Sequence, residues 1–230
     1  AMIAAIDQKL TEQVNLVLHH EDFQKLEGAW RGLHYMVNNT ETDELLKIRV
    51  MNISKKDLGK TLKKFKGTAW DQSPIFKKVY EEEYGTFGGQ PFGALIGDYY
   101  FSNHPQDMLL LEKMSQVAAA ANAPFISAPA PQLFGWENFS EMTEVRDLAK
   151  IFDRTEYAKW RSFRDSEDSR YVGLTMPRTL MRLPYGKETV PTETFNFEED
   201  VDGKDHNKYL WGNAAYSFGT RLTEAFAMVQ

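Results

Sequence analysis

The apolar run Phe92–Phe101, with the helical pattern that follows it, constrains the fold more than any other feature of the chain. A short run of this kind is typical of a strand buried on both faces of a sheet. Pro105 suits the first turn of a helix that we expect to reach about Asn122, and Pro124–Ala128 has the pattern of a second short strand. A strand, a helix and a strand in this order predict an α/β layer with partly parallel strands.

Two amphipathic helical stripes precede this layer, and both repeat at spacings of three and four residues. Their apolar positions are Ile3, Ile6, Leu10, Val14 and Val17 in the first stripe, and Phe23, Leu26, Trp30, Leu33 and Val37 in the second. Leu46–Val50 alternates apolar and basic residues, which predicts a half-buried strand. Ser54 is a good N-cap for a lysine-rich helix that runs to about Lys66.

Further helices are expected over Pro74–Tyr84, Ser140–Phe152 and Thr155–Asp165, and a strand over Tyr171–Thr175. We therefore predict the α/β class, with α+β as the alternative: helices layered on a mixed, partly parallel sheet and preceded by two N-terminal helices. The expected divisions are a helical pair at 1–40, an α/β domain at 41–176, an irregular acidic loop region at 177–208 and a helix at 209–230.

The last of these helices, Tyr209–Val229, places Trp211, Phe218 and Leu222 on one apolar face. With the second N-terminal stripe, this face predicts a structural core that includes Trp30, Leu33, Trp211, Phe218 and Leu222, with both tryptophans mostly buried. A start signal is lacking before Ala1 and a stop signal is lacking at Gln230, so we expect a fragment of a longer polypeptide.

Composition excludes several classes of function. The 230 residues carry a net charge of −6, which argues against general binding to a phosphate backbone. The absence of cysteine excludes disulfides, thiol chemistry and cysteine-based zinc sites. No signal peptide is visible in Ala1 to Leu10, and no apolar run is long enough to span a bilayer, so membrane insertion is not expected.

Three polar or glycine-rich motifs resemble binding sites only in part. Adjacent residues of His19-His20-Glu21-Asp22 point in different directions on a helix, which favours polar capping at a helix junction over a metal site. The glycines precede a strand instead of following one, which indicates a turn and not a phosphate loop; they are Gly85, Gly88, Gly89 and Gly93. Glu198-x-Asp200-x-Asp202-Gly203 begins like a calcium loop, but Tyr209 stands where a bidentate glutamate is needed.

Two further groups concern catalysis and contacts. Asp98, His104 and Asp107 lie around the end of the predicted strand, where ligands often bind in α/β sheets, but no nucleophile is spaced with them. The middle of the chain is rich in arginines interleaved with acids, which favours contacts with a protein over a nucleic-acid groove. We take as candidate subunit contacts Arg161, Arg164, Asp165, Glu167 and Asp168.

Three segments resemble one family closely. They are Phe23-Gln-Lys-Leu-Glu-Gly-Ala-Trp30-Arg-Gly-Leu-His-Tyr-Met-Val37, Met181-Arg-Leu-Pro-Tyr-Gly186, and the long segment from Phe197 to Phe226 that contains Tyr-Leu-Trp211-Gly-Asn-Ala-Ala-Tyr-Ser-Phe-Gly. Together they resemble the large sheath subunit of bacterial type VI secretion systems, the TssC/VipB/EvpB family. Long ordered strings of tryptophan, glycine and other aromatic residues make this resemblance specific, and it spans nearly the whole chain.

The resemblance implies a structural protein of the bacterial cytoplasm that carries no catalytic site, cofactor or metal. It implies pairing with a small sheath subunit of the TssB/VipA type, and stacking with other copies of that heterodimer into a contractile sheath around a tube of Hcp rings. It further implies anchoring of the sheath at the envelope baseplate, effector delivery by contraction, and disassembly by the ClpV ATPase. The alternatives are a hydrolase-type α/β enzyme, which would use Asp98, His104 and Asp107, and an adaptor that binds a single partner.

Overall fold

A three-stranded parallel sheet forms the centre of the computed structural model, which describes residues 2–65 and 67–229. The strands β1 (Leu95–Phe101), β2 (Phe125–Pro129) and β3 (Val172–Leu174) lie in the order β1-β2-β3. Leu95 pairs with Phe125, and Phe125 pairs with Val172. Helix α5 (Pro105–Ala120) connects β1 to β2. The predicted α/β class and the parallel strands are confirmed.

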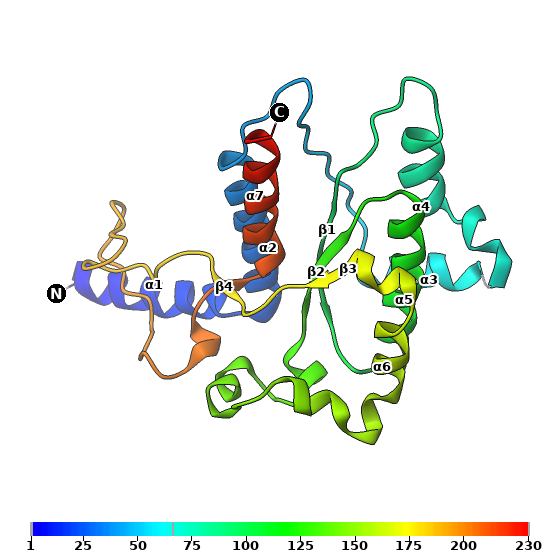
Figure 1. The fold of residues 1–230 in the computed structure, drawn as a ribbon. Helices are drawn as coiled ribbons and strands as arrows, with labels where there is room; N and C mark the ends of the chain where they lie inside the picture. Colours follow the sequence, from blue (N-terminus) through cyan, green and yellow to red (C-terminus); the bar gives the residue numbers. More distant parts are fainter. Residues whose placement is uncertain (1, 66, 230) are drawn as a thin grey trace.

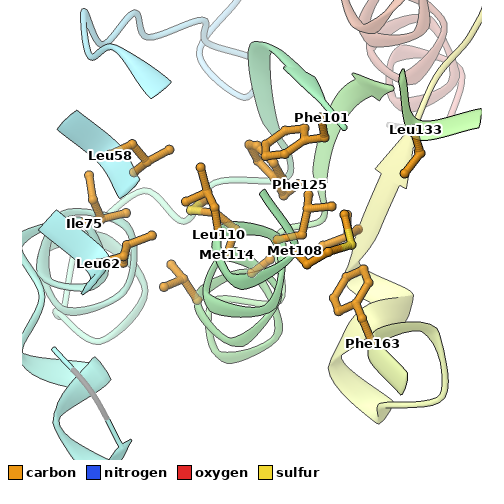
Figure 2. Close-up of a cluster of buried hydrophobic side chains, with 14 of the residues drawn as sticks. Leu58, Leu62, Ile75, Phe101, Met108, Leu110, Met114, Phe125, Leu133 and Phe163 are labelled. Carbon is orange, nitrogen blue, oxygen red and sulfur yellow. The ribbon is translucent and has the colours of Figure 1, made fainter. Parts of the chain in front are cut away.

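On one side of the sheet, α5 packs with α3 (Lys55–Lys64), α6 (Ala158–Arg164) and the sheet itself to form the main apolar core (Figures 1 and 2). Phe101 and Leu111 are fully buried in this core, and Leu58 and Leu62 join it from α3. α3 begins where predicted, because the hydroxyl of Ser54 accepts a hydrogen bond from the backbone N–H of Asp57.

On the other side of the sheet, α7 (Ala214–Ala227) contacts β1 and β2, and α2 (Glu21–Asn38) packs along α7. The two helices run in the same direction: Gly32 lies against Tyr216, Met36 against Gly219, and the hydroxyls of Thr40 and Thr223 are 3.0 Å apart. α1 (Met2–Leu18) then extends away from this pair (Figure 1). The two predicted N-terminal helices are confirmed.

The rest of the chain is built from short elements. α4 (Pro74–Phe76) continues as a π-helix, η2 (Lys77–Tyr84), and β4 (Thr179–Leu180) pairs antiparallel with β5 (Trp211–Gly212). The 3-10 segments are η1 (Gly67–Gln72), η3 (Pro131–Phe134), η4 (Phe139–Glu144), η5 (Ala149–Asp153), η6 (Thr155–Tyr157), η7 (Glu167–Tyr171) and η8 (His206–Lys208). Within the region 177–208, which the sequence predicts to be irregular, β4 and η8 are regular and residues 181–205 are mostly irregular.

Two predicted elements are wrong, and a third begins at a different residue. Leu46–Val50 forms no strand. Arg49, within this segment, forms an ion pair with Glu83. Ser140–Phe152 forms 3-10 turns in place of an α-helix. The last helix begins at Ala214 and not at Tyr209, because Asn213 caps it and Trp211 belongs to β5. Ala1, Lys66 and Gln230, which end predicted ranges, lie outside the described residues.

Candidate assembly surfaces

Three of the five residues of the apolar stripe of α2, namely Leu26, Trp30 and Val37, face solvent, although the sequence predicts that the stripe is buried. Gly28, Gly32 and Met36 are the buried positions, and they lie one turn apart on the face toward α7 and β5. Trp30 lies on the opposite face and is 66% exposed, with Leu26 and Val37 beside it on the same stripe and also exposed. The prediction that Trp30 is a core residue is therefore wrong, because α2 packs through its glycines.

The remaining predicted core residues of this region are also incompletely covered. Phe218 is 43% exposed, so its predicted burial is wrong as well: α7 turns Ala215, Gly219 and Thr220 inward instead. Leu33, Trp211 and Leu222 are half-buried. The indole N–H of Trp211 donates to the carbonyl oxygen of His206 at 2.7 Å, which fixes the ring at the edge of the fold.

α1 extends the exposed apolar surface. None of its described residues is buried, and its large apolar side chains open to solvent are Met2, Ile3, Ile6, Leu10, Leu16 and Val17. The chain as a whole exposes 14646 Å² of surface. A compact monomer of 26.5 kDa is expected to expose only about 10,700 Å². Excess surface with apolar stripes is typical of a polypeptide that packs against other chain segments or subunits.

A buried ion-pair network fixes the irregular loop to α2. The guanidinium of Arg182 contacts Glu199 at 2.6 Å and Glu27 at 2.8 Å, and the Arg182 and Glu199 side chains are only 7% and 1% exposed. Burial lowers the pKa of Arg182, but the hydrogen bonds and charges of Glu199 and Glu27 raise it on balance. His19 lies 3.3 Å from Glu199, so the end of α1 joins the same cluster. The network holds loop and helices in one arrangement.

The two arginines proposed as subunit contacts bind backbone carbonyl oxygens of nearby residues in the same chain. Arg161 donates to the carbonyl oxygens of Phe152 and Arg154, and Arg164 donates to those of Ser169 and Val172. These bonds close the turns around α6 and η7. Asp165 and Glu167 remain exposed and Asp168 is half-exposed, so the part of these residues in subunit contacts stays a prediction.

Asp98, His104 and Asp107 do not converge on one site. Asp98 accepts a hydrogen bond from the Tyr216 hydroxyl of α7 at 3.1 Å, on one side of the sheet. Although Asp98 reaches solvent, partial burial raises the pKa of its carboxyl, against hydrogen bonds from Tyr216 and Asn213 that lower it. Asp107 pairs with Lys55 at 2.8 Å, on the other side. His104 caps α5 by accepting from the backbone N–H of Gln106.

The other motifs have structural roles. His20 caps α2 by accepting from the backbone N–H of Asp22, which confirms the predicted helix junction. Asp202 accepts from the backbone N–H groups of Lys204 and Asp205, as in a tight turn. Gly88 adopts a positive φ of 81° in the turn before β1, which confirms the predicted turn. Within residues 2–65 and 67–229, no cluster of three or more His, Cys, Asp or Glu side chains could hold a metal ion.

Two surfaces of the molecule are not predicted from the sequence. One is the glycine face of α2, whose signal is the spacing of Gly28 and Gly32, because small residues four apart permit close helix packing. The other is the outer face of α3, where lysines gather opposite the buried Leu58 and Leu62. Among the described residues, no helix is long and apolar enough to cross a membrane.

Comparison with known proteins identifies one family. The family model described as VipB, "EvpB/VC_A0108, tail sheath N-terminal domain", matches residues 1–230. The chain is 62% identical over 228 residues to the type VI secretion system sheath protein TssC1 of Pseudomonas aeruginosa. This alignment covers 99% of the chain but 46% of that relative, so the chain spans about half the length of the curated relative it matches.

Proposed function

Because the chain belongs to the VipB/EvpB tail sheath family, we propose that it forms part of the large subunit of a contractile type VI secretion sheath. The family is one of structural sheath proteins. In this proposal, the subunit pairs with a small sheath subunit in the bacterial cytoplasm, and copies of the pair stack around a tube of Hcp rings. Contraction then drives the tube outward, and an ATPase of the ClpV type recovers the subunits.

The observation that carries this proposal is the exposed apolar stripe of α2. Leu26, Trp30 and Val37 turn to solvent on a helix whose other face is already packed against α7. Covering such a stripe releases about 25 cal/mol per Å² of apolar surface, so a matching helix or strand of another chain gains affinity there. An adaptor with a single partner would also use this surface, but it would not build tubules.

The test is co-expression of the complete sheath protein with its small subunit, followed by co-purification and electron microscopy. We expect tubules from the unmodified pair. The combined change Leu26→Ser, Trp30→Ser and Val37→Ser is expected to abolish them while circular dichroism of the large subunit stays unchanged. A one-to-one complex without tubules would favour the adaptor, and an absence of any complex would overturn the proposal.

A matched control removes apolar side chains that lie outside the α2 stripe. Leu45 and Phe87 are also exposed, but both lie in loops. Leu45→Ser with Phe87→Ser is expected to leave tubule yield close to that of the unmodified pair. An equal loss of tubules in the control would show that general loss of apolar surface, and not the α2 stripe, explains the defect.

A further inference from the structure

The outer face of α3 concentrates positive charge in an acidic protein. The helix contains five lysines and one aspartate within Lys55–Lys64, whereas the whole chain has a net charge of −6. Leu58 and Leu62 face the core, so the exposed lysines share the outer face; they are Lys56, Lys60, Lys63 and Lys64. We call these four the α3 lysine face. Lys60, Lys63 and Lys64 also line a shallow surface hollow with Asp57 and Thr61.

This face is poorly neutralised within the chain. Lys55, at its margin, pairs with Asp107, and Lys60 lies 3.9 Å from Asp57. Among residues 2–65 and 67–229, Lys56, Lys63 and Lys64 form no ion pair. Like charges three and four residues apart on a helix repel one another, which costs stability unless an opposite charge approaches. The chemistry that suits this face is a row of carboxylates.

The segment 187–205 offers such carboxylates and is held in place. Its acidic side chains open to solvent are Glu188, Glu193, Glu198, Asp200, Asp202 and Asp205. We call it the acidic segment. Residues 187–208 contain seven acids and three lysines, so the charge is opposite to that of α3. Phe197 is buried, and Glu199 is fixed by Arg182, so the segment does not have to be ordered entirely on binding.

The two surfaces lie at opposite ends of the molecule. Figure 1 shows α3 on one side of the sheet and the acidic segment on the far side, next to α1. They are too far apart to meet within one molecule. A contact between them joins one copy to the next head to tail, and such a heterologous contact generates a ring or an open helical array.

We propose that the α3 lysine face of one copy binds the acidic segment of a second copy. The proposal rests on the proposed function in one respect: a sheath is built from contacts that repeat in this head-to-tail sense. Both surfaces are exposed, so the contact is screened by salt. It therefore suits an interface that adjusts subunits already joined through apolar surfaces.

Charge reversal in the 230-residue chain tests the contact directly. Sedimentation velocity over a concentration series is measured at about 0.01 M and about 1 M salt, where the Debye length is about 30 Å and 3 Å. We expect concentration-dependent association at low salt that disappears at high salt. Lys60→Glu, Lys63→Glu and Lys64→Glu together should weaken it about tenfold or more, because the face then repels the acidic segment.

The acidic partner is tested with Glu188→Lys and Glu193→Lys, because no hydrogen bond or ion pair is described for either side chain. This variant should also associate weakly with itself. Mixed with the α3 variant, it should associate about as strongly as the unmodified chain, since opposite charges then face each other again. The matched control Lys9→Glu, Lys47→Glu and Lys159→Glu makes the same charge change on other exposed lysines and should have little effect.

Zero-length carbodiimide cross-linking of a mixture of unlabelled and ¹⁵N-labelled chains identifies which residues of two different copies lie in contact. Mixed-isotope links between a lysine of the α3 face and a carboxylate of the acidic segment are expected. The inference is overturned if the unmodified chain does not associate at low salt, if the control reversal weakens association equally, or if links join other surfaces. Tubule assembly by the complete protein tests the sheath assignment separately, because an adjusting contact of this kind is not needed to hold the subunits together.

Discussion

The two sides of the central sheet are stabilised by different means. On the α5 side, Phe101 and Leu111 are fully buried in a continuous apolar core. On the α2 side, close contact is made through Gly28 and Gly32, and a buried arginine joins the helix to the loop. Leu26, Trp30 and Val37 of α2 point outward there. One side therefore uses its apolar residues internally, while the other leaves them available to another chain segment.

An apolar stripe and a buried face are therefore separate properties of a helix. Helical periodicity identifies where apolar residues gather, and on α5 and α3 these positions are inside. On α2, the small residues allow α7 to approach closely, so the packed face is the one with glycines. Packing density decides which face turns inward, and the remaining stripe is left for assembly.

The largest expected effect is on the ion-pair network of the α2 side. Arg182→Met removes the guanidinium that pairs with the almost fully buried Glu199, and it removes one of the two arginines that pair with Glu27. Loss of the guanidinium charge beside this buried carboxylate should lower the free energy of unfolding by about 3–5 kcal/mol. Urea denaturation followed by circular dichroism measures the loss. Lys25→Met removes the exposed pair with Glu21 and should cost clearly less; equal losses would contradict a special role for Arg182.

A comparable effect is expected on the α5 side, from loss of volume and not of charge. Leu111 is 0% exposed on α5, in the middle of the apolar core. Leu111→Ala should lower the free energy of unfolding by about 2–5 kcal/mol, because it leaves a cavity. Leu109→Ala, at a more exposed position two residues away, is the control and should cost clearly less. If both substitutions cost the same, the core would not be organised around the inner face of α5.

The sequence predicted the α5 side well. Pro105 marks the start of α5, and the two short apolar runs mark β1 and β2. Only β2 is buried along its whole length, so the predicted burial of the first run on both faces is wrong for the edge strand β1. Local signals were insufficient for Leu46–Val50, since a strand requires backbone pairing with a neighbouring strand and the described residues provide none for this segment. The start of the last helix was also missed, because Trp211 reads equally well on a helix face and in the short pair with Leu180.

The candidate surfaces were harder to predict, because exposure depends on contacts made far along the chain. Arg161 and Arg164 looked like surface contacts, yet their guanidinium groups bind backbone carbonyl oxygens nearby. Glu199 and Arg182 gave no sign of burial, since each lies in an irregular, charged segment. Charge signs can be read from sequence, but the partners that neutralise charges depend on the tertiary structure.

A smaller effect is expected where α2 meets α7. A side chain at position 32 would overlap the ring of Tyr216. Gly32→Val should therefore force the helices apart and lower the free energy of unfolding by about 1–3 kcal/mol. Gly59→Val is the control, because its only close neighbour is a methyl group of Leu110 at ordinary contact distance. Thermal denaturation compares the two, and an unchanged melting temperature in Gly32→Val would show that α2 does not depend on close packing.

The smallest effect on stability is expected at Trp30, and it separates the two sides of the sheet most sharply. A buried tryptophan replaced by alanine costs about 3–5 kcal/mol, but Trp30 is 66% exposed and lies away from the α7 contact. Trp30→Ala should therefore change the free energy of unfolding of the chain by about 0.5 kcal/mol or less. In the complete protein, the same substitution should still reduce recovery of the small sheath subunit, because a tryptophan within an apolar stripe is a typical hot spot of a protein interface. Chemical denaturation and co-purification measure the two effects on one variant. A loss of stability as large as that of Leu111→Ala would mean that Trp30 belongs to the core of the chain after all, and that the outward stripe of α2 is not an assembly surface.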